Sequence, residues 1–81
     1  MFNFKDSYDI NDLITIVSIL RSENGCPWDK VQTDASIKAD FIEEVYEVIE
    51  AIDMDSAEML REELGDVLLQ VVFHSQIKTE E

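Results

Sequence analysis

The sequence predicts an all-α protein whose helices pack side by side as an antiparallel bundle. Three observations support this. Apolar residues recur at helical spacing in three segments, no segment alternates as a half-buried strand would, and one loop, residues 22–33, holds the single proline and one of the two glycines. At 81 residues the chain has room for one domain. We therefore expect a single helical domain over residues 1–81.

The first helix is predicted from about Ile10 to Arg21, with Asp9 or Asn11 as its cap. Its apolar face consists of Leu13, Ile14, Val17 and Leu20. Residues 1–8 precede it as an arm whose two phenylalanines, Phe2 and Phe4, are candidates for docking on the body. This helix contributes one apolar face and no acidic cluster.

The second helix is predicted to start at Thr33 or Asp34, either of which can cap it, and to end near Ile52. Its apolar side consists of Phe41, Ile42, Val45, Val48, Ile49 and Ile52. Acids line the other side, at Glu43, Glu44, Glu47 and Glu50. A short turn at residues 53–56 makes the second and third helices antiparallel neighbours.

The third helix is predicted from about Ser56 to Ile77, with Asp55 and Glu58 as a capping box. From Leu60 onward it is apolar almost all round. At about 100° per residue, its strong polar groups share an arc of about 80°: Glu63, Asp66, Gln70 and His74. A helix this apolar is normally buried, and two short helices cannot cover it. We expect a homodimer, or a higher homo-oligomer, that completes a four-helix-like core.

One glycine lies inside this third helix. Gly65 lowers helix stability relative to alanine. Close packing against a neighbouring helix is the expected reason for it.

The charge balance is strongly acidic, with 19 acidic against 6 basic residues and a net charge of −13. This disfavours binding to a nucleic acid polymer, which depends on Lys and Arg at the phosphates. Phosphate chemistry is compatible with such a charge only if a metal takes part. A lone cysteine, Cys26, excludes an intramolecular disulfide, and no signal peptide or membrane-length apolar run is visible. We expect a cytoplasmic protein with no membrane partner.

Two acidic pairs carry the chemistry that the sequence indicates. Glu44 and Glu47 are three residues apart and so lie on one helix face, and Glu63 and Asp66 repeat that spacing. Antiparallel packing can bring the pairs face to face, and four carboxylates make a hard-oxygen site suited to Mg²⁺ or Mn²⁺. A solvated acidic surface has the same spacing, so spacing alone leaves both interpretations open. The interpretation as solvated surface is strongest for Glu43 and Glu50 and weakest for Glu63 and Asp66, which interrupt an apolar face.

The acidic motifs also resemble a known family. Glu43-Glu44-x-x-Glu47, followed after 15 residues by Glu63-x-x-Asp66, is similar to the EExxE…ExxD signature of the all-α nucleoside triphosphate pyrophosphohydrolases. Within them, GCPWDKVQT at 25–33 and ELGDVLLQVVFHSQ at 63–76 resemble MazG proteins. Together and in this order, the motifs cover most of the chain from about Leu20 onward.

The resemblance implies Mg²⁺-dependent hydrolysis of a nucleoside triphosphate to the monophosphate and pyrophosphate. It implies that the metal ligands are Glu44, Glu47, Glu63 and Asp66. Glu43 would support a ligand or orient the attacking water, and Glu44 and Glu47 are alternative bases. Trp28 would line the substrate pocket or, in the structural alternative, anchor the loop on the bundle. Lys30 and Lys38, beside the acidic helix, are candidates for the phosphate oxygens.

MazG domains usually continue past their third helix, so the resemblance implies a domain truncated at its C-terminal end. This leaves three alternative functions open. One is a relative specialised for dUTP/dCTP or phosphoribosyl-ATP, a second is a non-catalytic, metal-stabilised dimerisation module, and a third is a plain acidic interaction domain. The CPWD loop argues against the first of these, and metal binding without product would identify the second.

Overall fold

The computed structural model describes residues 7–81, which form three α-helices and one short 3-10 helix. They are α1 (Ile10–Leu20), η1 (Asp29–Val31), α2 (Asp34–Asp53) and α3 (Ala57–Thr79). No strand occurs in this part of the chain, so the predicted all-α class is confirmed and each helix ends within two residues of its predicted bounds. The predicted docking of Phe2 and Phe4 lies outside the described residues.

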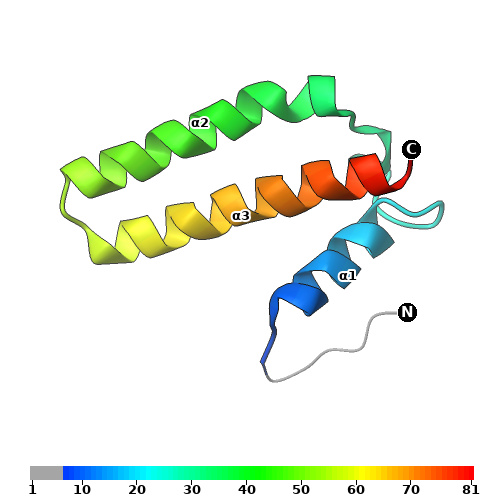
Figure 1. Cartoon of the computed structure of the whole chain (residues 1–81), viewed down its shortest axis with the longest axis horizontal. Coiled ribbons are helices and arrows are strands. Elements are labelled where there is room, and N and C mark those ends of the chain that lie inside the picture. Colours follow the sequence, from blue (N-terminus) through cyan, green and yellow to red (C-terminus); the bar gives the residue numbers. More distant parts are fainter. Residues whose placement is uncertain (1–6) are drawn as a thin grey trace.

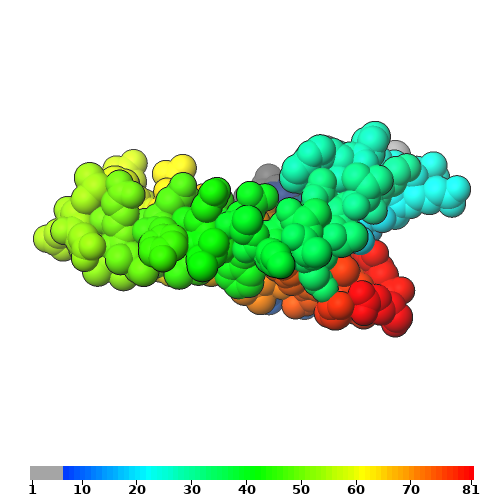
Figure 2. Space-filling model, turned by 90° about the horizontal axis from the view of Figure 1, so that it is seen from above, coloured from blue at the N-terminus to red at the C-terminus, as the bar shows by residue number. Residues whose placement is uncertain are grey.

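The helices α2 and α3 lie side by side and antiparallel, and α1 crosses the C-terminal half of α3 at an angle (Figure 1). Seen from above, α2 follows the length of α3, and the loop after α1 lies at one end of the molecule (Figure 2). The main contact between helices is the one between α2 and α3, which is called the seam below (Figure 1). No helix of residues 7–81 is long and apolar enough to cross a membrane.

Side-chain caps define where α1 and α2 begin. The Asp9 carboxylate accepts from the Asp12 backbone N–H at 2.9 Å, and the Asp12 carboxylate accepts from the Asp9 N–H at 2.9 Å. The same reciprocal arrangement joins Thr33 and Ser36 at the start of α2. Both pairs satisfy backbone donors that a helix start leaves without partners. Asp9 and Thr33 are thus the caps among the predicted alternatives.

The turn before α3 differs from the prediction. Ser56, rather than Asp55, caps α3, and its hydroxyl accepts from the Met59 N–H at 3.2 Å. Asp55 has a φ of 53°, in the left-handed region, where a short polar side chain is tolerated better than most. The predicted capping box of Asp55 with Glu58 is therefore wrong, because the turn needs Asp55 for the chain reversal itself.

The two glycines have different surroundings. A Cβ on Gly25 would lie 2.3 Å from the Ile19 carbonyl oxygen, so the loop can return this closely to α1 only without a side chain. A Cβ on Gly65 would have nothing within 4 Å. The close packing expected at Gly65 is therefore wrong for this structure.

The buried apolar core is small. It consists of Val17, Ile37, Ala51, Val72 and Ile77. Much of α3 that the sequence predicted to be buried remains open, with Leu64, Leu68, Leu69 and Val71 each 41–50% exposed. A single copy therefore leaves apolar surface uncovered on the helix that carries half of the acidic cluster.

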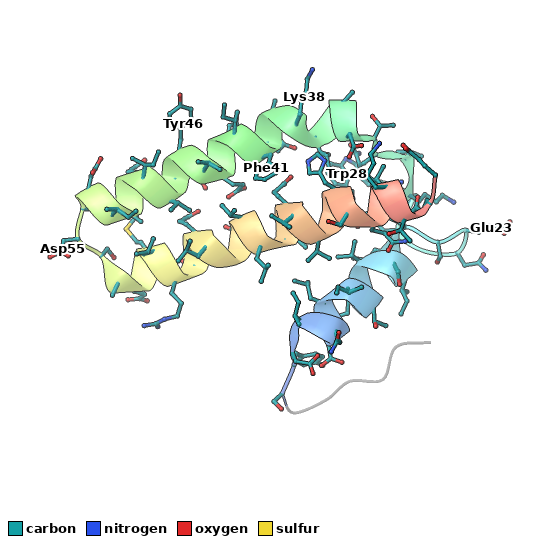
Figure 3. The ribbon with its side chains drawn as sticks, in the orientation of Figure 1. Glu23, Trp28, Lys38, Phe41, Tyr46 and Asp55 are labelled. Atoms are coloured by element: carbon teal, nitrogen blue, oxygen red, sulfur yellow. The ribbon has the colours of Figure 1, made fainter. Side chains whose placement is uncertain are left out.

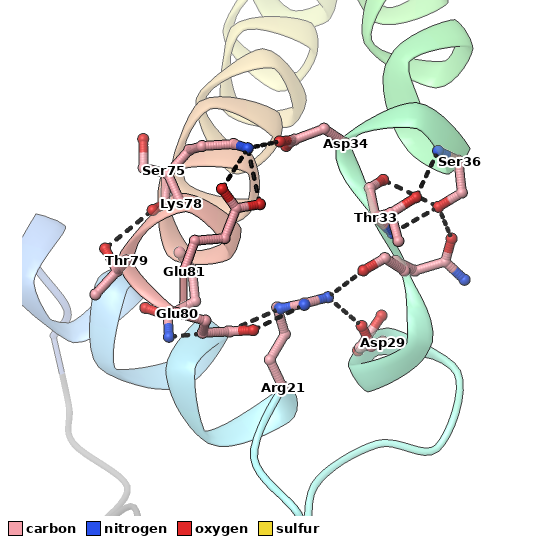
Figure 4. A network of polar contacts seen from close by, with 12 residues as sticks. Arg21, Asp29, Thr33, Asp34, Ser36, Ser75, Lys78, Thr79, Glu80 and Glu81 are labelled. Carbon is pink, nitrogen blue, oxygen red and sulfur yellow. Dashed lines mark hydrogen bonds and ion pairs between the residues drawn. The ribbon is translucent and has the colours of Figure 1, made fainter.

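Arg21 fixes the loop after α1 (Figure 4). One of its guanidinium nitrogens donates to the carbonyls of Asp29 and Gln32, both at 2.8 Å. The other two donate to the Glu80 carboxylate at the end of α3, both at 2.9 Å, and the guanidinium lies 5.5 Å from the centre of the Phe73 ring. Because the Arg21 side chain is only 7% exposed, these contacts hold the loop that contains Trp28 against α3.

Candidate metal centre

The structure brings four carboxylates together at the middle of the seam. Glu44 and Glu47 come from α2, and Glu63 and Asp66 come from α3. Each offers one oxygen, and these oxygens all lie within 4.8 Å of one another. Glu44 and Glu63 are half-buried, while Glu47 and Asp66 are exposed. The i, i+3 spacing on antiparallel helices accounts for the convergence, because each pair lies on the face toward its neighbour.

Mutual repulsion and burial change the acidity of this cluster. Burial is the main cause that raises the pKa of Glu44, followed by the neighbouring charges of Glu47 and Asp66. Hydrogen bonding to Glu47, burial and the same neighbouring charges raise the pKa of Glu63 to about 7. Like charges held this close favour protonation of one of them. A cation bound between the carboxylates would offset this repulsion and lower their pKa values again.

Two oxygens of the cluster have no partner of their own. Glu44 Oε2 and Glu63 Oε2 are buried and accept no hydrogen bond. No lysine, arginine or histidine among residues 7–81 forms an ion pair with any of the four carboxylates. Buried carboxylate oxygens without partners are costly, and carboxylate oxygens are the ligands that Mg²⁺ and Mn²⁺ prefer. The residues present thus fit a divalent cation.

The fifth acid of the motif lies elsewhere. Glu43 is exposed and does not share the cluster. Glu43 and Glu44 are adjacent on α2, so a helix directs their side chains about 100° apart. Of the three acids in the motif on α2, Glu44 and Glu47 therefore point toward α3, and Glu43 does not.

The polar stripe of α3 continues beyond the carboxylates toward its C-terminal end. His74 Nδ1 lies 2.7 Å from an oxygen of Asp34, and Lys78 Nζ lies 2.8 Å from the other. Lys78 first and His74 second lower the pKa of Asp34. His74 also lies against Phe41, with ring centres 5.4 Å apart. The contact of His74 with Asp34 was not predicted. The four-residue spacing of His74 and Lys78 on one helix face is the sequence signal that could have indicated a shared acidic partner.

Of the three predicted substrate-binding residues, Trp28 shares a cavity with side chains of both α2 and α3. It is 62% exposed, which a buried anchor would not be, so the anchor interpretation is wrong for this structure. Trp28 lines a cavity of about 120 Å³ together with Asp29, Ile37, Asp40, Leu69, Gln70 and Phe73.

The two predicted lysines lie apart from the cluster. Lys30 Nζ donates to the Glu23 carbonyl at 3.1 Å, within the loop. Lys38 is exposed and points from α2 away from α3, as Tyr46 does, whereas Phe41 points toward α3 (Figure 3). Neither lysine has an ion pair with the four carboxylates.

Comparison with known proteins agrees with these motifs. Residues 32–81 match the MazG nucleotide pyrophosphohydrolase domain. The chain is 58% identical over 69 residues to the nucleoside triphosphate pyrophosphohydrolase/pyrophosphatase MazG of Thermotoga maritima, covering 85% of this chain and 27% of that protein. It is 53% identical over 73 residues to the nucleoside triphosphate pyrophosphohydrolase of Escherichia coli K12, covering 89% of this chain and 28% of that protein.

The uncharacterized protein YabN of Bacillus subtilis is 50% identical over 74 residues, which cover 91% of this chain and 15% of YabN. The chain thus spans little more than a quarter of these relatives at most. The family match covers more than half of the chain and includes all four clustered carboxylates. The chain therefore belongs to the MazG nucleotide pyrophosphohydrolase family.

Proposed function

We propose that this chain hydrolyses nucleoside triphosphates to the nucleoside monophosphate and pyrophosphate, with Mg²⁺ as its metal and Mn²⁺ as a substitute. The observation that carries the proposal is the convergence of four carboxylate oxygens within 4.8 Å, two of them from residues with buried, partnerless oxygens. Relatives that share more than half of their aligned residues are named as enzymes of this activity. A nucleotide is then the substrate of this seam.

In this proposal Glu44, Glu47, Glu63 and Asp66 hold the metal. A bound divalent cation would neutralise the triphosphate, lower the pKa of water and stabilise the leaving pyrophosphate. A carboxylate of the chain must accept the proton of the attacking water, and in this proposal Glu44, Glu47 and the neighbouring Glu43 are the candidates for that base. Exposure of Glu43 supports a role in orienting water or a ligand rather than in holding the metal.

The substrate is bound by Trp28, Lys30 and Lys38 in this proposal. Trp28 is exposed beside the seam and offers a face for the base. Lys30 and Lys38 are on the surface with side chains long enough to turn toward phosphate oxygens, which requires Lys30 to leave the Glu23 carbonyl. Nucleoside triphosphates are metabolites of the cytoplasm, and we place the protein there.

The active form in this proposal is a homodimer. Apolar side chains of α2 and α3 remain exposed on one copy, at Ile42, Val45, Ile49, Ile52, Leu64 and Leu68. A second copy can cover them and complete a four-helix-like core. Light scattering coupled to size exclusion should give twice the 9.3 kDa chain mass, and Leu64→Glu with Leu68→Glu should shift the protein to the monomer. A monomeric wild type would exclude this assembly.

The first test is incubation of the purified chain with Mg²⁺ and each canonical triphosphate, followed by ion-exchange separation of products. Monophosphate with pyrophosphate, both lost on chelation, is the expected result. Monophosphate with two orthophosphates would mean a different cleavage. Metal binding and dimers without any product would instead identify the non-catalytic dimerisation module.

A further inference from the structure

The loop of residues 22–33 is not held in place by burial of its own large apolar side chains. Trp28 is 62% exposed and Val31 is 67% exposed. A loop that buries so little of its surface keeps one conformation only if hydrogen bonds restrain it. The hydrogen bonds around Trp28 therefore decide where its ring lies.

Gln32 bridges Trp28 to the start of α2. Its Nε2 donates to the Trp28 carbonyl at 3.1 Å, and its Oε1 accepts from the Ser36 Oγ at 2.7 Å. The Trp28 carbonyl can only accept, which fixes the orientation of the Gln32 amide. The Ser36 hydroxyl proton has the Thr33 carbonyl, at 3.0 Å, as an alternative acceptor. One side chain thus links the peptide group of Trp28 to the first turn of α2.

The backbone of Gln32 is restrained independently of its side chain. Its carbonyl accepts from Arg21 at 2.8 Å, and its N–H donates to the Asp29 carbonyl at 3.3 Å. Arg21 in turn contacts Glu80 at the end of α3 (Figure 4). The Gln32 side chain therefore extends from a backbone that is already ordered, so the two bonds that it forms cost little further ordering.

The partner of Gln32 on α2 adjoins the cavity that Trp28 lines. Ile37, the residue after Ser36, lines this cavity together with Leu69 and Phe73 of α3. A peptide group of Trp28 that is fastened to Ser36 keeps the tryptophan beside both helices of the seam. The motif GCPWDKVQT thus contains, in its glutamine, the side chain that locates its tryptophan.

We propose that Gln32 is a positioning residue, which acts on the substrate through Trp28 and does not itself contact the nucleotide. The inference rests on the proposed function for the role of Trp28. It adds that substrate affinity depends on the attachment of the Trp28 loop to α2. In this proposal Trp28 binds a part of the nucleotide that does not react, so its correct position strengthens binding of the ground state and the transition state alike.

Two variants remove the bridge in different ways. Gln32→Met has a similar length and forms no hydrogen bond at either end, whereas Gln32→Glu keeps an acceptor for Ser36 and loses the donor to Trp28. Trp28 is the single tryptophan of the chain, so time-resolved fluorescence anisotropy measures its local rotation without substrate. We expect the amplitude of fast rotation to be larger in both variants than in the wild type.

The expected kinetic result is a difference between the two constants. In both variants KM for the triphosphate should rise about fivefold with kcat unchanged, because the lost hydrogen bond loosens a group that binds the ground state and the transition state equally. A purely structural role of Gln32 would instead reduce the fraction of active protein, which lowers kcat and leaves KM as it is.

The matched control is Asn24→Leu, which removes an amide from the same loop. Asn24 is exposed, and its side chain has no hydrogen bond within residues 7–81. This variant should match the wild type in anisotropy, KM and kcat. Circular dichroism would verify that all three variants are helical.

Each result of this experiment has one meaning. Unchanged anisotropy in both Gln32 variants would overturn the inference, since other groups would then hold Trp28. Faster rotation of Trp28 with an unchanged KM, or a lower kcat with an unchanged KM, would overturn it as well. A wild type that releases no product would contradict the proposed function, whereas the anisotropy would still show whether Gln32 holds Trp28.

Discussion

Acidic side chains have basic partners at the C-terminal end of α3 but none in the middle of the helix. At the end, Asp34 contacts both His74 and Lys78, and Glu80 shares two hydrogen bonds with Arg21. In the middle, Glu44 and Glu63 face other acids and keep buried oxygens without partners. The pKa of Asp34 is lowered, mainly by Lys78, whereas the pKa of Glu63 is raised to about 7.

This contrast shows where the chain uses its few cations. It has 6 lysines and arginines against 19 acids, and two of those cations, Arg21 and Lys78, hold the helix ends together. The middle of the seam is left with acids alone among the described residues. Paired charges at the end stabilise the fold, and unpaired charges in the middle destabilise it unless a cation from solution binds there.

The largest effect is expected from neutralising one acid in the middle. Glu63→Gln should reduce pyrophosphate release at least about 100-fold, because the cluster loses a charged ligand and stabilisation of the reacting phosphates. The same change should raise the melting temperature in EDTA, since it removes repulsion by Glu47, Asp66 and Glu44. A product assay and a thermal melt measure the two effects.

Glu62→Gln is the matched control, since Glu62 is the exposed neighbour of Glu63 on α3. Glu62→Gln should change neither pyrophosphate release nor the melting temperature by much. If Glu63→Gln kept full activity, the assignment of this cluster would fail. If Glu63→Gln melted at a lower temperature than the wild type in EDTA, the repulsion inferred for the metal-free cluster would be absent.

The sequence predicts the middle of the seam better than its end. Glu44, Glu47, Glu63 and Asp66 are predictable because i, i+3 spacing on two antiparallel helices fixes their positions. The contact between Arg21 and Glu80 joins residues 59 positions apart, and no local period indicates it. Asp55 is another miss, since only the turn geometry reveals its positive φ. Local periodicity thus gives faces of helices, while the loop contacts depend on the assembled fold.

An intermediate effect is expected at the paired end. Arg21→Met should lower the free energy of unfolding by about 2 kcal/mol, because Glu80 and the carbonyls of Asp29 and Gln32 lose charged donors. Urea unfolding measures this change, and Arg61→Met at an exposed position of α3 should cost little. Trp28 emission should shift as the loop is released. An unchanged urea midpoint would mean that water replaces these bonds without loss.

The smallest effect is a difference in pH dependence between the two regions. Asp34 has a lowered pKa, so its contribution to stability is present above 3.8 and is lost as the pH falls through the lower folded value. Glu63 has a raised pKa, so its contribution is present below 4.5 and is lost as the pH rises through about 7. Without metal, the chain should therefore be most stable in mildly acidic solution.

Melting temperatures from pH 3 to 8 in EDTA would resolve both changes, since Asp34→Asn should remove part of the acid loss and Glu63→Gln part of the loss toward pH 7. Excess Mg²⁺ should raise stability most near neutral pH, because protons and metal compete for the same carboxylates. At 100 times its dissociation constant it should add about 2.7 kcal/mol. If the pH of maximum stability were the same with and without Mg²⁺, the middle of the seam would bind no cation. The unpaired acids there would then only destabilise the fold.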